Sequence, residues 1–451
     1  MDVGELARVA EVVLGNPFET VAGREEAHAA VQAARARGTA TLEDLARKGQ
    51  HKVARRLLVA FVVDELAHEA VASFLDPRQC PERIFSELRL SREAVREVTA
   101  SAARCAASLH HIAGTSQAIA RVRAAVWRAC HGESVYDAIS MRPLIREQNV
   151  LVLGETGTGK ELVAQAIAAS DPDPDRVQVL NAAAIPEPLL ESELFGHKKG
   201  AFSGSVGDRE GKISAADGGT LFLDELADLP PVLQAKLLRV IDDDVVTPLG
   251  ANQGKKVDVR YVSATSQPLH AMVERGAFRR DLFERLAGIT IVLPPLRERL
   301  EDLRPIAERM FEQQSAPMAR SGASTANVGR LIVHQARFLA WLDSDEARAR
   351  PWNGNVRELQ TTLRRWLLGF RETPATTVEP TADATKAQSQ PQGLARVVDG
   401  AATLREVEDW YILHVLDKVE QHQRRAADVL GIDRGTLARR LRQIDGTDDE
   451  R

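Results

Sequence analysis

A glycine-rich loop that ends in lysine constrains this chain more than any other feature. Residues Gly154–Lys160 fit the pattern G-x-x-x-x-G-K, between the apolar run Val150–Leu153 and the helix-forming run Glu161–Ala169. Glycines let several backbone N–H groups point at phosphate oxygens, and the helix N-terminus adds a favourable dipole. The pattern predicts a nucleotide-binding loop. Its candidate binding residues are Gly154, Glu155, Thr156, Gly157, Thr158, Gly159, Lys160 and Glu161.

Two carboxylates follow a second apolar run. Thr220–Leu223 predicts a buried strand that ends in Asp224 and Glu225, and ligands of parallel sheets bind at this end of the strands. Asp224 can hold Mg²⁺, and Glu225 can polarise a water for attack on the γ-phosphate of ATP. Because Glu161 stands where Ser or Thr usually offers Mg²⁺ a hydroxyl, we expect other groups and water to hold the metal.

Short apolar runs alternate with helical stretches in the middle of the chain. These runs are Val150–Leu153, Val177–Leu180, Leu221–Leu223, Val257–Ala264 and Ile289–Leu293. Strands separated by helices predict a parallel sheet with crossover helices, an α/β fold. Residues 1 to about 110 are predicted to be helical instead. One helix face there is marked by the i, i+3, i+4 spacing of Leu6, Val9, Ala10, Val13 and Leu14.

Composition and charge exclude several classes of protein. The 451 residues are 44% hydrophobic and 27% charged, an ordinary globular balance, and the net charge of −5 argues against a uniformly basic coat for nucleic acid. Cys80, Cys105 and Cys130 form no C-x-x-C pair, which favours reduced thiols. Asp2 and Glu5 stand where a signal peptide carries positive charge. We therefore expect a soluble, cytoplasmic protein with no membrane partner.

With these residues in place, the region from about 112 to 372 resembles the AAA+ domain of bacterial enhancer-binding proteins, the activators of sigma-54 RNA polymerase. The most diagnostic stretch is Glu191–Ser205, ESELFGHKKGAFSGS, which looks like the family's ESELFGHxxGAFTGA insertion. In the family this loop rises from the ATPase ring and contacts the sigma factor. Ser203 replaces Thr and Ser205 replaces Ala. The resemblance implies a sigma-54 loop of Gly200, Ala201, Phe202, Ser203, Gly204 and Ser205.

The resemblance also implies catalytic roles. Asn181 looks like the asparagine that relays Glu225 to the sigma-54 loop. Phe278–Leu286 looks like the family's arginine-finger segment, with Arg279 and Arg285 at the matching positions. An arginine from a neighbouring subunit stabilises charge on the transferring phosphoryl group. The alternative is that both arginines simply lie on the surface of a helix.

Two further segments match the family with one change each. Val262–Ser266 resembles a sensor strand that usually ends in Asn. Ser266, which the resemblance implies as a nucleotide-binding residue, retains a hydrogen-bonding group with a shorter reach. Trp352–Leu359, WNGNVREL, resembles the family's WPGNVREL, with Asn353 in place of Pro. Arg357 keeps the position of the lid arginine that reaches bound nucleotide.

The C-terminal segment reads as helix, tight turn, helix. Gly431 suits the turn and Asp433 can cap the next helix. The segment resembles the Fis-type helix-turn-helix, whose second helix enters the major groove. Arg424–Arg442 holds six arginines and two aspartates, a local basic excess; the alternative is a solvated helix face. The candidate DNA-binding residues are Arg434, Thr436, Arg439 and Arg440.

The expected order of parts is a helical regulatory domain (1–110), an α/β subdomain (111–298), a helical lid (299–372), a flexible linker (373–400) and a helix-turn-helix domain (401–446). The resemblance implies a sigma-54-dependent activator that binds upstream enhancer DNA as a dimer. It would form a hexameric ring and use ATP, with Mg²⁺, to remodel the closed complex of the sigma-54 RNA polymerase holoenzyme. Two alternatives stay open: a DNA-binding AAA+ ATPase regulator whose altered GAFSGS loop does not engage sigma-54, and a module that uses ATP only to assemble.

Overall fold

The computed structural model describes most of the chain in two separate units. The described residues are 2–19, 21–67, 80–171, 173–201, 207–320, 325–368, 370, 412, 423, 425, 427 and 434–444. The units comprise Met1–Thr373 and Pro374–Arg451. The predicted linker, 373–400, lies outside the described residues, as does much of the predicted domain at 401–446.

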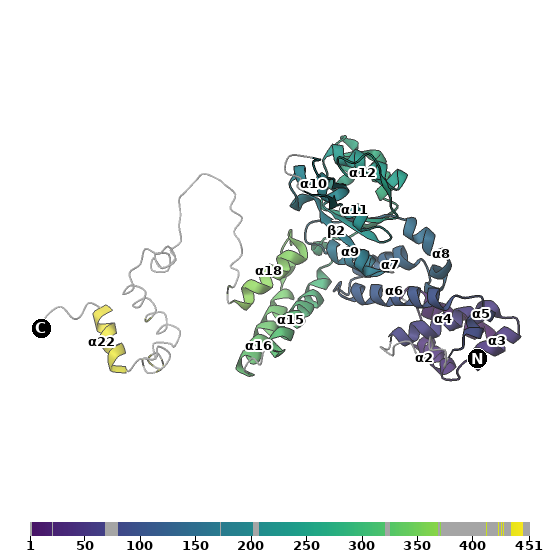
Figure 1. Ribbon diagram of the computed structural model, residues 1–451. Coiled ribbons are helices and arrows are strands. Elements are labelled where there is room, and N and C mark those ends of the chain that lie inside the picture. The colour runs from purple at the N-terminus through teal and green to yellow at the C-terminus, as the bar shows by residue number, and fades with distance from the viewer. Residues whose placement is uncertain are drawn as a thin grey trace. The chain divides into compact units, whose positions relative to one another are not determined.

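A five-stranded parallel sheet forms the centre of the first unit (Figure 1). Its strands, in spatial order, are β2 (Gln178–Asn181), β5 (Thr220–Asp224), β8 (Arg260–Thr265), β1 (Val150–Leu153) and β9 (Ile289–Val292). Each predicted apolar run overlaps one of these strands, so the predicted α/β fold is confirmed. Strand β8 begins at Arg260 and not at Val257 as predicted. The Val257 N–H donates to the carbonyl oxygen of Asp244, so Val257 continues the antiparallel pair that Lys255–Lys256 forms with Val245–Val246.

Alternate residues of the strands face two different hydrophobic cores. Val150 and Val152 join one core, and Leu151 between them joins the other, as the two-residue period of a strand requires. The helices that follow the N-terminal region up to the lid are α7 (Gln117–His131), α8 (Val135–Glu147), α9 (Lys160–Ala169), α10 (Glu187–Phe195), α11 (Lys212–Ala215), α12 (Pro231–Asp243), α13 (Leu269–Glu274) and α14 (Arg280–Leu286).

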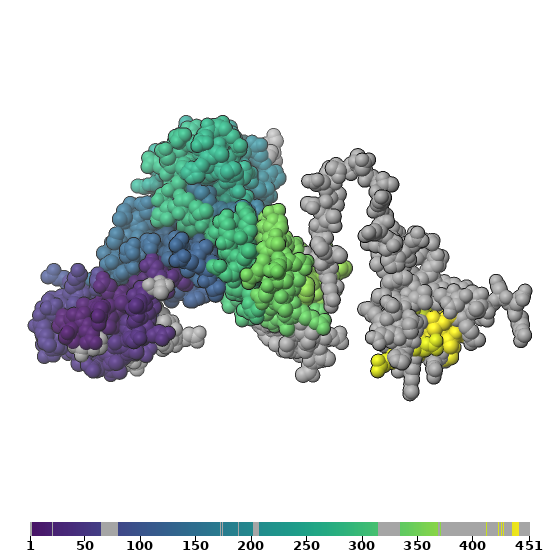
Figure 2. Space-filling model, turned by 180° about the vertical axis from the view of Figure 1, so that it is seen from behind, coloured from purple at the N-terminus to yellow at the C-terminus, as the bar shows by residue number. Residues whose placement is uncertain are grey.

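The N-terminal region is helical, as predicted. Its helices are α1 (Val3–Leu14), α2 (Arg24–Arg35), α3 (Ala40–Arg47), α4 (His51–Ala67), α5 (Glu82–Glu87) and α6 (Arg92–His110). The five apolar residues predicted to form one face of the first helix are the buried residues of α1. One continuous hydrophobic core runs from these helices to the sheet, and Figure 2 shows the purple and blue surfaces of the two regions meeting without a break.

Helix α6 is fastened to the end of helix α9, whose other end carries the glycine-rich loop. The Arg104 guanidinium donates to the carbonyl oxygens of Ala169 at 3.0 Å and Asp171 at 2.7 Å. A cation at the C-terminus of a helix also interacts favourably with the helix dipole. The N-terminal helix α6 is thus hydrogen-bonded to the end of α9, the helix that follows the phosphate loop.

A helical lid follows the sheet. It consists of α15 (Leu303–Arg320), α16 (Thr325–Leu342), α17 (Asp345–Ala349) and α18 (Asn355–Leu367). These helices surround a core of their own, which contains Phe311, Phe338, Trp352 and Leu359. Short 3₁₀ turns at Leu296–Glu298 (η4) and Leu300–Asp302 (η5) connect the sheet to the lid. The predicted helical region after the sheet is confirmed.

In the second unit the structure describes helix α22 (Arg434–Ile444), which contains the predicted recognition-helix residues. None of the helices within the described ranges has the length and apolar character needed to cross a membrane. All three cysteines lie buried as free thiols, as the sequence predicted.

Candidate functional site

The glycine-rich loop connects β1 to α9, as the pattern requires. Gly157 has a φ of 80°, and a Cβ there would lie 2.4 Å from the carbonyl oxygen of Gly354, so a side chain cannot be accommodated. The Lys160 ammonium folds back to donate to the carbonyl oxygens of Gly154 at 2.9 Å and Glu155 at 3.2 Å. Burial lowers the pKa of Lys160, while the carboxylates of Glu225 and Asp224 oppose this shift.

The two carboxylates, Asp224 and Glu225, lie at the end of β5 and differ in their surroundings. Asp224 is the last residue of β5 and lines a cavity together with Lys160. Burial raises the pKa of Asp224 above its ordinary value, and Lys160 opposes this rise. Glu225 has a left-handed backbone with a φ of 49°, which is costly for a residue with a side chain. Such strain is concentrated at functional sites.

The contacts of Asn181 differ from those that the family resemblance implied. The Asn181 amide donates to the Asp224 carboxylate at 2.7 Å, whereas Glu225 was its expected partner. The reason is the register of the sheet, since Asn181 is paired directly with Asp224 on the neighbouring parallel strand. Glu225 instead accepts hydrogen bonds from the backbone N–H of Ser266 at 3.1 Å and from its hydroxyl at 3.1 and 3.2 Å. Ser266 therefore reaches the glutamate despite its short side chain.

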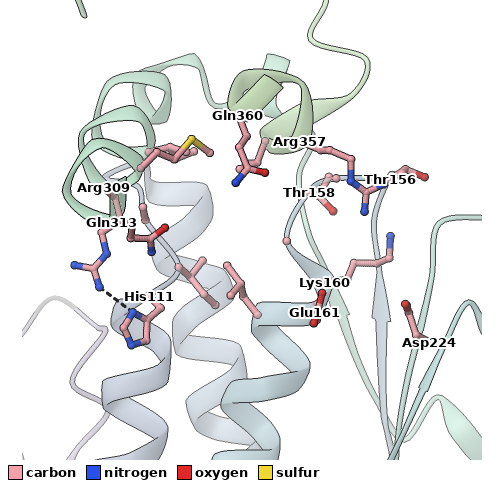
Figure 3. Close-up of a pocket in the computed structure, with 18 of the residues that line it drawn as sticks. His111, Thr156, Thr158, Lys160, Glu161, Asp224, Arg309, Gln313, Arg357 and Gln360 are labelled. Carbon is pink, nitrogen blue, oxygen red and sulfur yellow. Dashed lines mark hydrogen bonds between the residues drawn. The ribbon is translucent and has the colours of Figure 1, made fainter. Parts of the chain in front are cut away.

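A cavity of about 500 Å³ extends from these groups to the lid (Figure 3). Lys160 and Asp224 lie at one end of it, and His111, Arg309 and Gln313 lie at the other. The Arg309 guanidinium donates to His111 Nδ1 at 2.8 Å. The second end also has the apolar lining residues Ile112, Ala113, Ile306 and Met310. One end thus suits phosphates with their metal ion, and the other suits a flat, partly apolar group such as a nucleobase.

The sequence patterns did not predict which residues line the second end of the cavity, the end that suits a nucleobase (the base end). Its residues come from the segment before α7 and from helices α15 and α18, far apart in the sequence. By contrast, the predicted Arg357 and its neighbour Gln360 line the cavity from the lid (Figure 3). Buried Arg299 also lines the cavity and donates to the Thr158 carbonyl oxygen at 3.0 Å.

The two candidate finger arginines lie outside the cavity of their own chain. Arg279 forms a bidentate ion pair with Asp281 at 3.0 and 2.7 Å, and its side chain is 46% exposed. Arg285 pairs with Asp242 at 2.8 Å and is 63% exposed. Neither is among the residues that line the cavity. Both guanidinium groups are therefore accessible from outside this chain.

The candidate sigma-54 loop is described only at its base. Phe202, Ser203, Gly204 and Ser205 lie outside the described residues. The two sides of the base are joined by the antiparallel pair of β3 (Gly196–His197) and β4 (Arg209–Glu210), and by Lys198, whose ammonium donates to Asp208 at 2.7 Å. A second pair, β6 (Val245–Val246) with β7 (Lys255–Lys256), is attached through a bridge between His197 and Leu249.

The candidate DNA-binding residues all lie on α22. Arg434 begins this helix, Arg439 is exposed, and Thr436 and Arg440 are half-buried. Leu437 lies on the buried side of the same helix. This division into an apolar side and a basic side agrees with the helix-turn-helix prediction.

Two regions of the chain match known protein families. Residues 133–292 match the family model described as the Sigma-54 interaction domain. Residues 403–443 match the model described as Bacterial regulatory protein, Fis family. The first matched region contains the phosphate loop and its acidic pair, and the second contains helix α22 up to its last residue but one.

Individual proteins are similar over long stretches. The chain is 41% identical over 326 residues to the transcriptional regulatory protein ZraR of Klebsiella oxytoca, covering 68% of each chain. It is 38% identical over 320 residues to the DNA-binding transcriptional regulator NtrC of Escherichia coli (strain K12), covering 66% of this chain and 65% of NtrC. It thus spans about two thirds of the length of these relatives. A crystal structure of NtrX from Brucella abortus matches at a TM-score of 0.43, with 28% identity, over 81% of this chain and 73% of that chain.

Proposed function

Because this chain belongs to the bacterial enhancer-binding proteins, the ATP-hydrolysing activators of sigma-54-dependent transcription, we propose that it binds upstream DNA and uses ATP hydrolysis to open promoters held by sigma-54 RNA polymerase. The observation that carries the proposal is the two-ended cavity between the phosphate loop, the acidic pair and the lid. Its phosphate end joins a lysine to carboxylates at the ends of parallel strands, which suits a nucleoside triphosphate. Because bacterial DNA and RNA polymerase are its proposed targets, the protein would act in the cytoplasm.

Within this site each residue has a proposed task. Lys160 and the loop N–H groups bind the β- and γ-phosphates, and Arg357 approaches them from the lid. Asp224 would hold Mg²⁺, which neutralises charge on the phosphates, and Mg²⁺ is commonly bound by one or two carboxylates together with substrate phosphates. Glu225 orients the attacking water and draws a proton from it. Asn181 would fix the Asp224 carboxylate through its 2.7 Å hydrogen bond.

The exposed position of the two arginines, outside their own cavity, supports an oligomer. Arg279 and Arg285 are exposed and lie outside their own cavity, so they can serve the site of a neighbouring copy. A positive charge supplied in this way stabilises the transferring phosphoryl group. We propose the ring assembly of the family, in which each ATP site is completed by the next subunit.

The output of hydrolysis is proposed to pass through the 200–205 loop. The base of this loop follows α10, the helix after the strand that ends in Asn181. A change at the γ-phosphate can therefore reach the loop through Asp224, Asn181 and α10. Helix α22 supplies the second contact, with Arg434 and Thr436 reading bases and Arg439 and Arg440 holding DNA phosphates.

Ser266→Ala should lower kcat for ATP hydrolysis about tenfold, because a hydrogen bond to a charged group contributes about 1.5–3 kcal/mol and a partly exposed one contributes less. The hydroxyl of Ser266 holds the Glu225 carboxylate, but Ser266 does not line the cavity. We therefore expect KM for ATP to stay close to the native value. Steady-state kinetics measure both quantities. Ser263→Ala on the preceding strand β8 is a matched control, since its buried hydroxyl has no hydrogen-bond partner among the described residues. A higher KM with a native kcat would contradict the assigned role.

The experiment that tests the proposed function is open-complex formation in vitro. Purified protein is added with ATP to sigma-54 holoenzyme on a supercoiled sigma-54 promoter, and strand opening is read with a single-strand-specific chemical probe. We expect opening with ATP and none with a non-hydrolysable analogue or with Lys160→Ala. Opening that is absent with ATP, in a preparation that hydrolyses ATP normally, would refute the activator function.

A further inference from the structure

Glu155 belongs to the phosphate loop, yet its side chain is not among those that line the nucleotide cavity. Its carboxylate is held by Arg297, which follows the sheet and precedes the lid, through two hydrogen bonds of 2.6 and 2.8 Å. Such bidentate pairs fix the relative orientation of the two groups as well as their distance. The Arg297 guanidinium holds the pKa of Glu155 at about 2, so this carboxylate is charged at physiological pH.

Asn355, the first residue of lid helix α18, completes the contact from the other side. Its amide nitrogen donates to the Glu155 carboxylate at 3.2 Å and to the Thr156 carbonyl oxygen at 3.1 Å. Its amide oxygen accepts from the backbone N–H of Leu296 at 2.7 Å. Asn355 is completely buried and has a φ of 51°, a conformation that asparagine tolerates better than most residues. One side chain thus joins three chain segments.

The backbones of the lid and the phosphate loop also meet directly. The Val356 N–H donates to the carbonyl oxygen of Gly157 at 2.9 Å. The missing side chain of Gly157 leaves room for the Gly354 carbonyl. Arg357, the next residue, lines the cavity. The position of Arg357 over the nucleotide therefore depends on how helix α18 sits on this loop.

We propose that Glu155 is a positioning residue that forms a latch with Arg297 and Asn355, and that this latch holds the lid on the phosphate loop and Arg357 on the nucleotide. This inference rests on the proposed ATP site. The latch can open, because the side chains of Arg297 and Glu155 are 41% and 42% exposed and an ion pair between exposed side chains contributes little free energy. A closed latch retains nucleotide, and an open latch lets the lid swing away and release ADP.

The test compares nucleotide binding in Glu155→Gln, Arg297→Met and the double variant of the full chain. The readouts are Kd for fluorescent ATP and ADP analogues, the rate of ADP release, KM and kcat for ATP, and the melting temperature. Each single variant should raise both Kd values and the ADP release rate by about threefold to fivefold, the upper range for an exposed but bidentate pair. KM should rise by a similar factor, with a smaller change in kcat.

The double variant decides whether the two residues act as one unit. If they do, its Kd matches that of a single variant, whereas independent residues give the product of the two factors. Arg304→Met is the matched control, since this exposed lid arginine pairs with Glu308 and Asp343. We expect native binding from it. If Arg297→Met lowers the melting temperature, Arg297→Lys, which keeps the charge without the fork, should still weaken binding.

Native Kd values in both single variants, or a multiplicative effect in the double variant, would overturn the latch. Weaker binding that only follows a loss of folded protein would also overturn it. Failure of the ATP site on which the latch rests looks different, because the native chain itself would then bind no ATP.

Discussion

Glu225→Gln is expected to lower kcat for ATP hydrolysis by about 10²- to 10⁴-fold, the usual contribution of a positioned general base. Glutamine keeps the size of the side chain but cannot accept a proton from water. The left-handed backbone at Glu225 constrains the side chain whatever its charge, and the single amide oxygen of glutamine can still accept a hydrogen bond from Ser266. Binding of ATP should persist, because the lysine and the loop are unchanged.

The measurement is phosphate release together with the Kd of a fluorescent ATP analogue, for the variant and the native chain. Glu187→Gln, an exposed glutamate on α10, is the control and should hydrolyse ATP at the native rate. A Glu225→Gln protein that turns over ATP within a few-fold of the native rate would remove Glu225 from its assigned role. It would also favour the alternative in which ATP serves only for assembly.

Arg279→Ala and Arg285→Ala should each lower ATP turnover strongly, by about 10³- to 10⁵-fold if each acts as a full arginine finger. The reason is that both side chains lie outside their own cavity and would reach the site of a neighbour. Turnover is measured at protein concentrations that favour assembly. Arg280→Ala, an exposed neighbour on the same helix, is the matched control and should remain active.

Mixing two inactive variants tests the trans arrangement directly. Arg279→Ala retains its own acidic pair, and Glu225→Gln retains its own arginines. In a mixed ring, a site with an intact acidic pair receives an intact arginine from the next subunit, so part of the native turnover should return. A mixture that stays inactive, although the two proteins assemble together, would show that the arginine acts within its own chain or not at all.

The central part of the fold followed from local patterns in the sequence. The phosphate loop was predictable because strand, glycines, lysine and helix are consecutive. The five parallel strands were predictable because each coincides with a short apolar run. The inner strands β5, β8 and β1 are buried on both faces, which makes their runs nearly continuous. The same holds for α1, where the spacing of five apolar residues marked the buried face.

Other features depend on tertiary packing that no local pattern encodes. The base end of the cavity joins Ile112 and Ala113 to Met310 and Gln360, residues that meet only when the lid folds over the sheet. The partner of Asn181 was set by the register of β2 against β5. The contact of Arg104 with the end of α9 likewise links segments that the sequence does not connect.

The most direct test of the central claim is trapping of isolated sigma-54 by the purified protein with ADP and aluminium fluoride, which mimics the transferring phosphoryl group. We predict a stable complex on native gels that is lost in Phe202→Ala, with ATP hydrolysis retained by that variant. Such a result would also show that Ser203 and Ser205 are tolerated in the loop. Absence of any complex from a preparation that hydrolyses ATP normally would contradict the account, since the motor would then act on a partner other than sigma-54.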